Sequence, residues 1–305
     1  LERTKWKRVG KEILKDWRLY VLLIPLLLFM FMFKYLPIKG VLQAFKNNDG
    51  LNATTTVMHD DWMGLIGFKN LFNDVSFWTA FRTFVNSMYG LVFGFPIPIF
   101  LALLFSEIKC YGYRSVVQVC SYLPKFLSTV VTTTIITIWC RNSQGDLGIL
   151  TKVFMNFGWI SSTDSILEMP KFFRPIYQVS GVWEGAGYGS IVYFAAVLAI
   201  SPTNYEAAKI DGANKLQQIR YVTLPSMAPT LTIMLIMRIG QILNIGYEKV
   251  MLLYQPGSYE TADVISTYVY RKQTVANDFS VGTAADLFNS IIAMFLVLGA
   301  NAISR

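Results

Sequence analysis

The chain has 305 residues, of which 53% are hydrophobic and only 15% are charged. Soluble proteins carry about 25% charged residues, so this composition indicates a membrane protein. The net charge of +8 does not indicate a nucleic-acid partner, because the basic residues stand at the ends of apolar runs rather than together on a polar surface. The single histidine, His59, has no partners at the spacing of metal ligands, so we expect no metal site. Three cysteines without CxxC spacing are expected to be buried free thiols: Cys110, Cys120 and Cys140.

Six apolar runs predict six membrane-spanning helices, because crossing a bilayer takes about 20 apolar residues in one hydrogen-bonded segment. The predicted spans are about 19–36, 84–105, 116–140, 181–200, 224–247 and 284–303. The fourth run is the weakest, since Glu184 and several glycines stand at its front. No small-residue cleavage site follows the first run, which we interpret as a span rather than a signal peptide. The predicted fold is all-α, with a basic segment at 1–18 and one transmembrane domain at 19–305.

The basic residues predict the orientation, because lysine and arginine are enriched on the cytoplasmic side of a membrane. The segment 1–18 holds seven of them, and the short linkers 106–115 and 201–223 hold more. The long linkers between the other runs are poorer in basic residues for their length. We therefore expect a multi-pass protein whose N- and C-termini both lie in the cytoplasm.

A charged, glycine-containing segment separates two of the apolar runs at residues 201–223. It opens on Ser-Pro, a helix-start signal, and Asp211-Gly212 in its middle is a helix-stop signal. A second helix with apolar residues three apart follows, and Pro225 is expected to end it at the membrane border. The pattern predicts two short helices joined by a tight turn on the cytoplasmic face. Two amphipathic helices lying on lipid headgroups would produce the same pattern.

This segment resembles the cytoplasmic EAA loop of permease subunits in binding-protein-dependent ABC importers. Other stretches, such as LVFGFPIPIFLALLFSE and ILNIGYEKVMLLYQP, are similar to the LplB-type permeases of complex-carbohydrate importers in the maltose-permease superfamily. The chain departs from that pattern at Leu216 and Ile219, where many members carry bulky aromatic residues. The positions that match the loop motif are Glu206-Ala207-Ala208, Asp211-Gly212-Ala213 and Leu224-Pro225.

The resemblance implies the type I ABC importer permease fold, with a coupling helix that docks on an ATPase subunit. Glu206 would offer a charge to a basic residue of that subunit, Ala207 and Ala208 would permit close approach, and Gly212 would form the turn. The implied partners are a second permease subunit, two ATPase subunits and an extracytoplasmic solute-binding protein, in a bacterial plasma (inner) membrane. The chain lacks the GxxxxGK[ST] phosphate-binding loop and any catalytic constellation. We therefore expect no cofactor and no enzyme activity here, and ATP and magnesium in the partner ATPase.

Polar residues inside apolar runs predict a substrate pathway, since such groups are costly in lipid. Arg238 and Gln241 share one helix face, and the arginine suggests an anionic sugar, such as an alginate fragment. Hydrogen bonds between helices, or an ion pair with Glu184 or with the second permease, would also explain these residues, and an aromatic belt would explain Tyr247. The full set of pathway candidates is Arg238, Gln241, Asn244, Tyr247, Glu184 and Asn289.

The predicted function is half of the translocation pathway of an ATP-driven importer for oligo- or polysaccharides. The coupling helix would transmit ATPase motion to the spans by alternating access. Two alternatives remain at this point. A membrane-embedded enzyme would act without any ATPase. A secondary transporter would normally show inverted repeats and buried acidic residues, whereas only Glu184 and Glu248 are found, both near the outer edge.

Overall fold

The structure is a computed structural model, which describes residues 15, 17–46, 62–82, 84–143, 146–161, 165–243 and 246–304. Within these residues the chain is almost entirely helical, and strands occur only as the short antiparallel pair β1 (Asn142–Ser143) and β2 (Asp146–Leu147). The α-helices are α2 (Trp17–Met30), α3 (Ile66–Asn73), α4 (Val75–Arg82), α5 (Phe84–Gly94), α6 (Pro96–Glu107), α7 (Tyr111–Tyr122), α8 (Thr129–Cys140), α9 (Ile149–Asn156), α10 (Pro170–Leu198), α11 (Pro202–Ile210), α12 (Lys215–Gln218), α13 (Leu224–Gly240), α14 (Tyr247–Leu253), α15 (Tyr259–Ala262), α16 (Ile265–Tyr270) and α17 (Phe279–Ile303). Tighter or wider helical turns extend or join them at Phe31–Tyr35, Leu36–Phe45, Leu123–Phe126, Ile166–Glu168, Ile219–Thr223, Pro256–Ser258 and Arg271–Val275.

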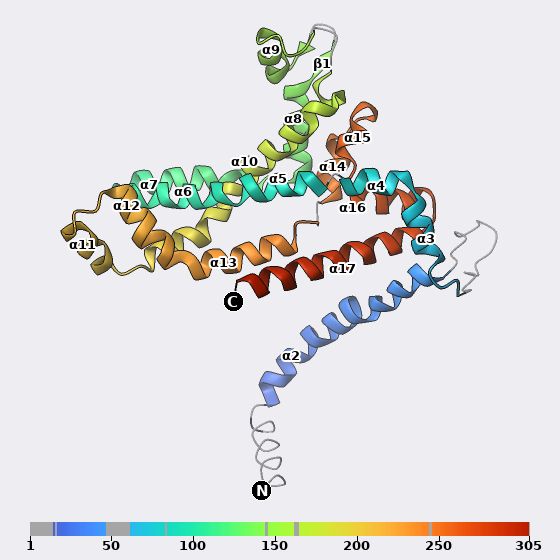
Figure 1. Cartoon of the computed structure of the whole chain (residues 1–305), viewed down its shortest axis with the longest axis horizontal. Coiled ribbons are helices and arrows are strands. Elements are labelled where there is room, and N and C mark those ends of the chain that lie inside the picture. Colours follow the sequence, from blue (N-terminus) through green and yellow to red (C-terminus); the bar gives the residue numbers. More distant parts are fainter. Residues whose placement is uncertain are drawn as a thin grey trace.

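The long helices form a bundle with distinct ends (Figure 1). Helix α10 packs against α5, α6, α7 and α13, while α17 packs against α13. Helices α11 and α12 lie at one end of the bundle, and α3, α4 and α16 lie at the other end. Helices α8 and α9 project away from the bundle, and α2 diverges from it toward the N-terminus (Figure 1).

By length and composition, up to six spans can be counted in the described residues, if each bent helix pair is taken as one span. In the described residues, four helical stretches are long and apolar enough to cross a membrane: Trp17–Phe45, Met88–Glu107, Lys215–Gly240 and Phe279–Ile303. Two bent pairs complete the set: Tyr111–Phe126 with Thr129–Cys140, and Pro170–Leu198 with Pro202–Ile210.

The predicted third span, 116–140, is not one straight helix. Its two halves meet at a bend of 95°. Pro124 opens a tight helical turn, and the chain then becomes extended at Ser128, whose side chain accepts a 3.3 Å hydrogen bond from the amide of Val131 and begins α8. A proline followed by an N-cap is a local signal for a new helix, but the surrounding apolar residues conceal it in a hydropathy reading.

Two other predicted spans differ from the structure at their ends. The fourth begins at Pro170 rather than near residue 181. Helix α10 extends beyond the apolar run on its N-terminal side, through a more polar segment. The fifth is continuous with the segment before it, from Lys215 to Gly240, so Pro225 does not end the second short helix. The π-helical turn just before this proline widens the backbone there, and proline is tolerated in the first turn of a helix.

Much of the apolar surface is exposed in this chain alone. Helices α2 and α7 have no buried residue, and two of the cysteines expected to be buried, Cys110 and Cys120, are exposed. Only Cys140 is buried. In a membrane protein the lipid or another subunit can cover apolar side chains, so hydrophobicity does not predict burial within one chain.

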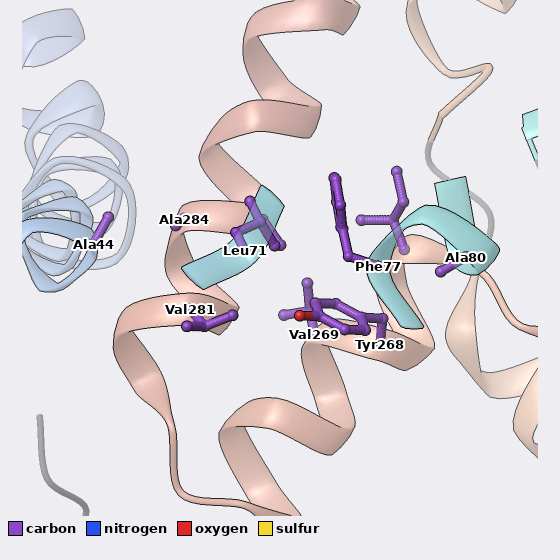
Figure 2. Close-up of a cluster of buried hydrophobic side chains, with 10 residues drawn as sticks. Ala44, Leu71, Phe77, Ala80, Tyr268, Val269, Val281 and Ala284 are labelled. Atoms are coloured by element: carbon purple, nitrogen blue, oxygen red, sulfur yellow. The ribbon is translucent and has the colours of Figure 1, made fainter. Parts of the chain in front are cut away.

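A packed core holds the end of the bundle where α3, α4 and α16 meet α17 (Figure 2). Phe77 and Tyr268 are almost fully buried there, with ring centroids 5.8 Å apart in an edge-to-face arrangement. The Tyr268 hydroxyl donates a 2.9 Å hydrogen bond to Asp74, whose carboxylate also pairs with Lys272. Burial raises the pKa of the Asp74 carboxyl, but hydrogen bonds from Lys272, Tyr268 and the amide of Ser76 outweigh it and hold the pKa below its ordinary value.

The closest contact between α10 and α7 depends on a glycine. A Cβ atom at Gly187 would overlap the backbone carbonyl of Ser121, whereas a Cβ at Gly185, on the same helix, would meet nothing within 4 Å. Small residues allow membrane helices to approach this closely.

We therefore expect Gly187→Ala to destabilise the fold by about 1–3 kcal/mol, because an overpacked site must push the two helices apart. Gly185→Ala is the matched control and should leave the thermal stability of the detergent-solubilised protein unchanged. Equal melting temperatures for the two variants would contradict the close contact.

Candidate translocation cavity and coupling helix

A cavity of about 610 Å³ lies between α5, α6, α10, α13 and α14. Glycines form much of two of its walls, spaced one helical turn apart: Gly90 and Gly94 on α5, and Gly181, Gly185 and Gly189 on α10. Side chains added at Gly181 or Gly185 would find open space rather than a neighbouring helix. The width of the cavity therefore depends on the absence of side chains along α10.

The cavity carries more positive than negative charge. Its lining includes three cations, Lys125, Arg238 and Lys249, and one carboxylate, Glu184. Lys249 Nζ donates a 2.9 Å hydrogen bond to Glu184 Oε2 and lies 5.4 Å from the centroid of the Tyr177 ring. Lys125 and Arg238 have no carboxylate partner among the described residues. The unpaired cations give the cavity an electrostatic preference for anions.

The turn after α11 has the geometry of a helix C-cap that requires glycine. Gly212 has a φ of +81°, in the left-handed region that favours this residue. Its amide donates to the Lys209 carbonyl at 3.0 Å, and the Ala213 amide donates to the Ala208 carbonyl at 2.9 Å. These two hydrogen bonds form a Schellman motif, which ends α11 and reverses the chain toward α12.

The second short helix is fixed to this turn by its own cap. Asn214 and Gln217 form a reciprocal capping box, with hydrogen bonds of 2.7 and 3.0 Å between each side chain and the other residue's amide. The buried Gln218 side chain donates to the Ala213 carbonyl at 2.8 Å. The two helices and their turn therefore form one compact unit.

Two contacts tie this unit to the long helices. The hydroxyls of Tyr205 and Thr223 lie 3.0 Å apart, which links α11 to the π-helical turn before α13. Lys215 Nζ lies 2.6 Å from Glu107 Oε2 at the end of α6. The outer surface of the unit stays open, since α11 has no buried residue and Ile210 is 86% exposed. No described residue of this chain covers Ile210, so this face of the unit is open to solvent, lipid or a partner.

Comparison with known proteins decides the family. Residues 94–305 match the protein family described as "Binding-protein-dependent transport system inner membrane component". The chain belongs to this family. It is similar to Protein LplB of Bacillus subtilis, with 33% identity over all of this chain and 90% of that protein. It is also similar to the polygalacturonan/rhamnogalacturonan transport system permease protein YteP of the same organism, with 31% identity over all of this chain and 92% of that protein.

Solved structures confirm the fold. A chain of a bacterial ABC transporter involved in the import of the acidic polysaccharide alginate has a TM-score of 0.87 and 39% identity, over 98% of both chains. A chain of a bacterial alginate ABC transporter in complex with an alginate pentasaccharide-bound periplasmic protein has a TM-score of 0.85 and 39% identity, over 97% of this chain and 96% of that one. The expected LplB-type relationship and the type I ABC importer permease fold are thereby confirmed, and the chain is a multi-pass membrane permease subunit.

Three of the predicted pathway residues lie together in the cavity wall: Arg238, Gln241 and Glu184. The ion pair considered between Arg238 and Glu184 does not form, because Glu184 pairs with Lys249 instead. The family contains importer permeases, which favours the permease interpretation over a secondary transporter or a membrane-embedded enzyme.

Two of the other predicted pathway residues lie outside the described cavity lining. Tyr247 is half exposed and stacks on Tyr270, with ring centroids 5.6 Å apart. Asn289 is on α17, outside the cavity lining, and its buried Oδ1 has no hydrogen-bond partner among the described residues. Asn244 lies outside the described residues.

The motif residues of the coupling segment lie on and after α11. Glu206, Ala207, Asp211 and Gly212 are exposed, while Ala208 and Ala213 are half-buried and form the Schellman contact.

Lys125 and Lys249 also line the cavity, although neither was among the predicted pathway residues. Lys125 stands inside the predicted span 116–140, where a lysine is unusual enough to mark a functional position. Lys249 carried no such signal, because it follows the apolar run and only the turn after α13 brings it back over the cavity.

Proposed function

We propose that this chain forms half of the translocation pathway of an ATP-driven importer for acidic oligo- or polysaccharides. The observation that carries the proposal is the cavity, whose described lining includes the cations Lys125, Arg238 and Lys249 and one carboxylate, that of Glu184. An oligosaccharide of uronic acids carries one carboxylate per ring, so it complements this surplus of positive charge. The 39% identity to a permease chain of an alginate importer supports the same substrate class.

The proposed assembly contains a second permease subunit, two ATPase subunits and an extracytoplasmic solute-binding protein. The ATPases supply the site for ATP and magnesium, and they dock on the exposed surface of α11 around Glu206 and Ile210. Helices α11 and α12 lie at the cytoplasmic end, where Lys209, Lys215 and Arg220 follow the positive-inside rule. Both termini are placed in the cytoplasm of a bacterium, and the opposite end of the bundle receives the sugar from the binding protein.

One continuous helix joins the proposed ATPase-docking unit to the cavity. Helix α13 continues α12 without interruption from Lys215 to Gly240. It carries Arg238 in the cavity wall, and Gln241 follows directly after its last residue. At 1.5 Å per residue, about 35 Å of helix separate Lys215 from Arg238. When the ATPases close on ATP and move α11, α13 tilts and changes which side of the membrane the cavity faces.

The substrate class is tested by Arg238→Ala in the assembled importer, reconstituted in proteoliposomes with its binding protein. We expect uptake of a mannuronate oligosaccharide to fall about tenfold, since losing one charge contact costs about 1.4 kcal/mol, while uptake of the neutral mannose oligosaccharide falls much less. Arg238→Lys keeps the charge and should retain most of the acidic uptake. Equal losses for both sugars would contradict the charge argument. Uptake without ATP would contradict the proposal that this importer is driven by ATP.

A further inference from the structure

The ion pair inside the cavity is incomplete on its acidic side. Glu184 of α10 and Lys249 of α14 are joined at 2.9 Å, and their side chains are only 21% and 11% exposed. Glu184 Oε1 is buried and has no hydrogen-bond partner among the described residues. Lys249 is better satisfied, because the Tyr177 ring also faces its ammonium group.

Such a pair is a poor device for stabilising a fold. Removing two charges from water costs several kcal/mol, and their attraction offsets this only when the remaining lone pairs find donors. The unpaired oxygen of Glu184 leaves that condition unmet. Apolar side chains of the same size would pack the site at least as well, so the pair calls for a functional explanation.

The position of the pair supplies that explanation. Both residues line the cavity, and a carboxylate on a uronic-acid ring is the same chemical group as the side chain of Glu184. Lys125 lines the cavity as well, and its positive charge repels that of Lys249. An arriving anion therefore meets two cations, one of which already holds a carboxylate.

We propose that Glu184 stands in for a substrate carboxylate on Lys249, and that an acidic sugar exchanges with it during transport. The inference rests on the proposed function and adds a specificity mechanism to it. Exchange replaces one ion pair on Lys249 by another of the same kind, so the sugar is recognised without being held tightly. Transport requires this balance, because a site must bind well enough to be entered and weakly enough to be left. A neutral sugar cannot displace Glu184 and gains nothing from Lys249.

Glu184→Gln tests the exchange in the assembled importer, because glutamine keeps the shape and removes the competing charge. With Lys249 free, we expect the KM for the mannuronate oligosaccharide to fall about fivefold and the maximal rate to fall as well, since release slows. The KM for the neutral mannose oligosaccharide should not change. Lys249→Gln should act in the opposite direction and raise the acidic KM about fivefold.

A merely structural ion pair gives a different result. In that case both variants would lower the yield of assembled importer and would affect the two sugars equally, with each KM unchanged. The double variant Glu184→Met with Lys249→Met controls for folding, because it removes both charges and fills the space. We expect it to assemble and to show a smaller preference for the acidic sugar, because Arg238 remains but Lys249 no longer contributes.

The outcomes separate this inference from the proposed function. Wild-type importer that fails to take up the mannuronate oligosaccharide overturns both. Wild-type importer that takes it up, together with a Glu184→Gln variant whose acidic KM is unchanged or raised, overturns the exchange alone. An assembled double methionine variant whose acidic preference equals that of the wild type also overturns the exchange.

Discussion

Replacement of Gly212 by proline is expected to abolish coupled transport while leaving the chain assembled in the membrane. Gly212 has a φ of +81°, whereas the proline ring holds φ near −65°, so the turn after α11 cannot keep its shape. Proline also lacks the amide that donates to the Lys209 carbonyl. The surface that we propose to dock on the ATPase then changes direction, and we expect uptake to fall by about an order of magnitude or more.

Asparagine at the same position is the matched control. It tolerates the left-handed conformation better than other side chains and retains the amide hydrogen bond, so Gly212→Asn should keep most of the transport activity. Uptake and ATP hydrolysis are measured together in proteoliposomes, with and without the loaded binding protein. A proline variant that couples hydrolysis to uptake as the wild type does would show that this turn does not transmit the motion.

A tryptophan at Gly185 is expected to block the pathway for every sugar. Gly185 lines the cavity, and an added Cβ meets nothing within 4 Å, so a bulky side chain extends into open space instead of pushing a helix away. The indole would project into the cavity and narrow the space through which a sugar ring must pass. We expect uptake of acidic and neutral oligosaccharides to fall together by about tenfold or more, without loss of assembled complex.

The comparison with Gly185→Ala separates obstruction from disturbance of the helix. Alanine adds only a methyl group and should leave both uptake and stability near the wild-type values. Normal uptake by the tryptophan variant would show that sugar does not pass through this cavity. The equal loss of both sugars also distinguishes this variant from Arg238→Ala, whose effect depends on charge.

The sequence predicted the coupling segment well because its signals are local. The Ser-Pro start, the Asp211-Gly212 stop and the short helix after it are each determined by neighbouring residues, and the structure forms all three. The exception is Pro225, which was expected to end the second helix but lies within a continuous one. The π-helical turn before it cannot be inferred from residue types, since it depends on how α13 packs against the rest of the bundle.

The cavity was only partly predictable, because it is formed by tertiary contacts. Arg238 and Gln241 share a helix face, and that relation follows from sequence spacing alone. Their meeting with Lys249 depends on the turn after Gly240, which shortens the predicted fifth span and begins α14 over the cavity. Lys125 lies in the tight turn Leu123–Phe126, next to the bend of the third span, and the apolar run around it conceals this bend.

The uninterrupted helix from Lys215 to Gly240 sets angular position as well as length. Each residue inserted into or deleted from this helix rotates everything beyond it by about 100° around the axis and shifts it by about 1.5 Å. A single extra residue would turn the guanidinium of Arg238 out of the cavity while leaving the docking surface of α11 untouched. If Arg238 selects the substrate as proposed, substrate choice depends on the rotational register of this helix as well as on the charge that it carries. Insertions and deletions in loops elsewhere in the chain do not change this register.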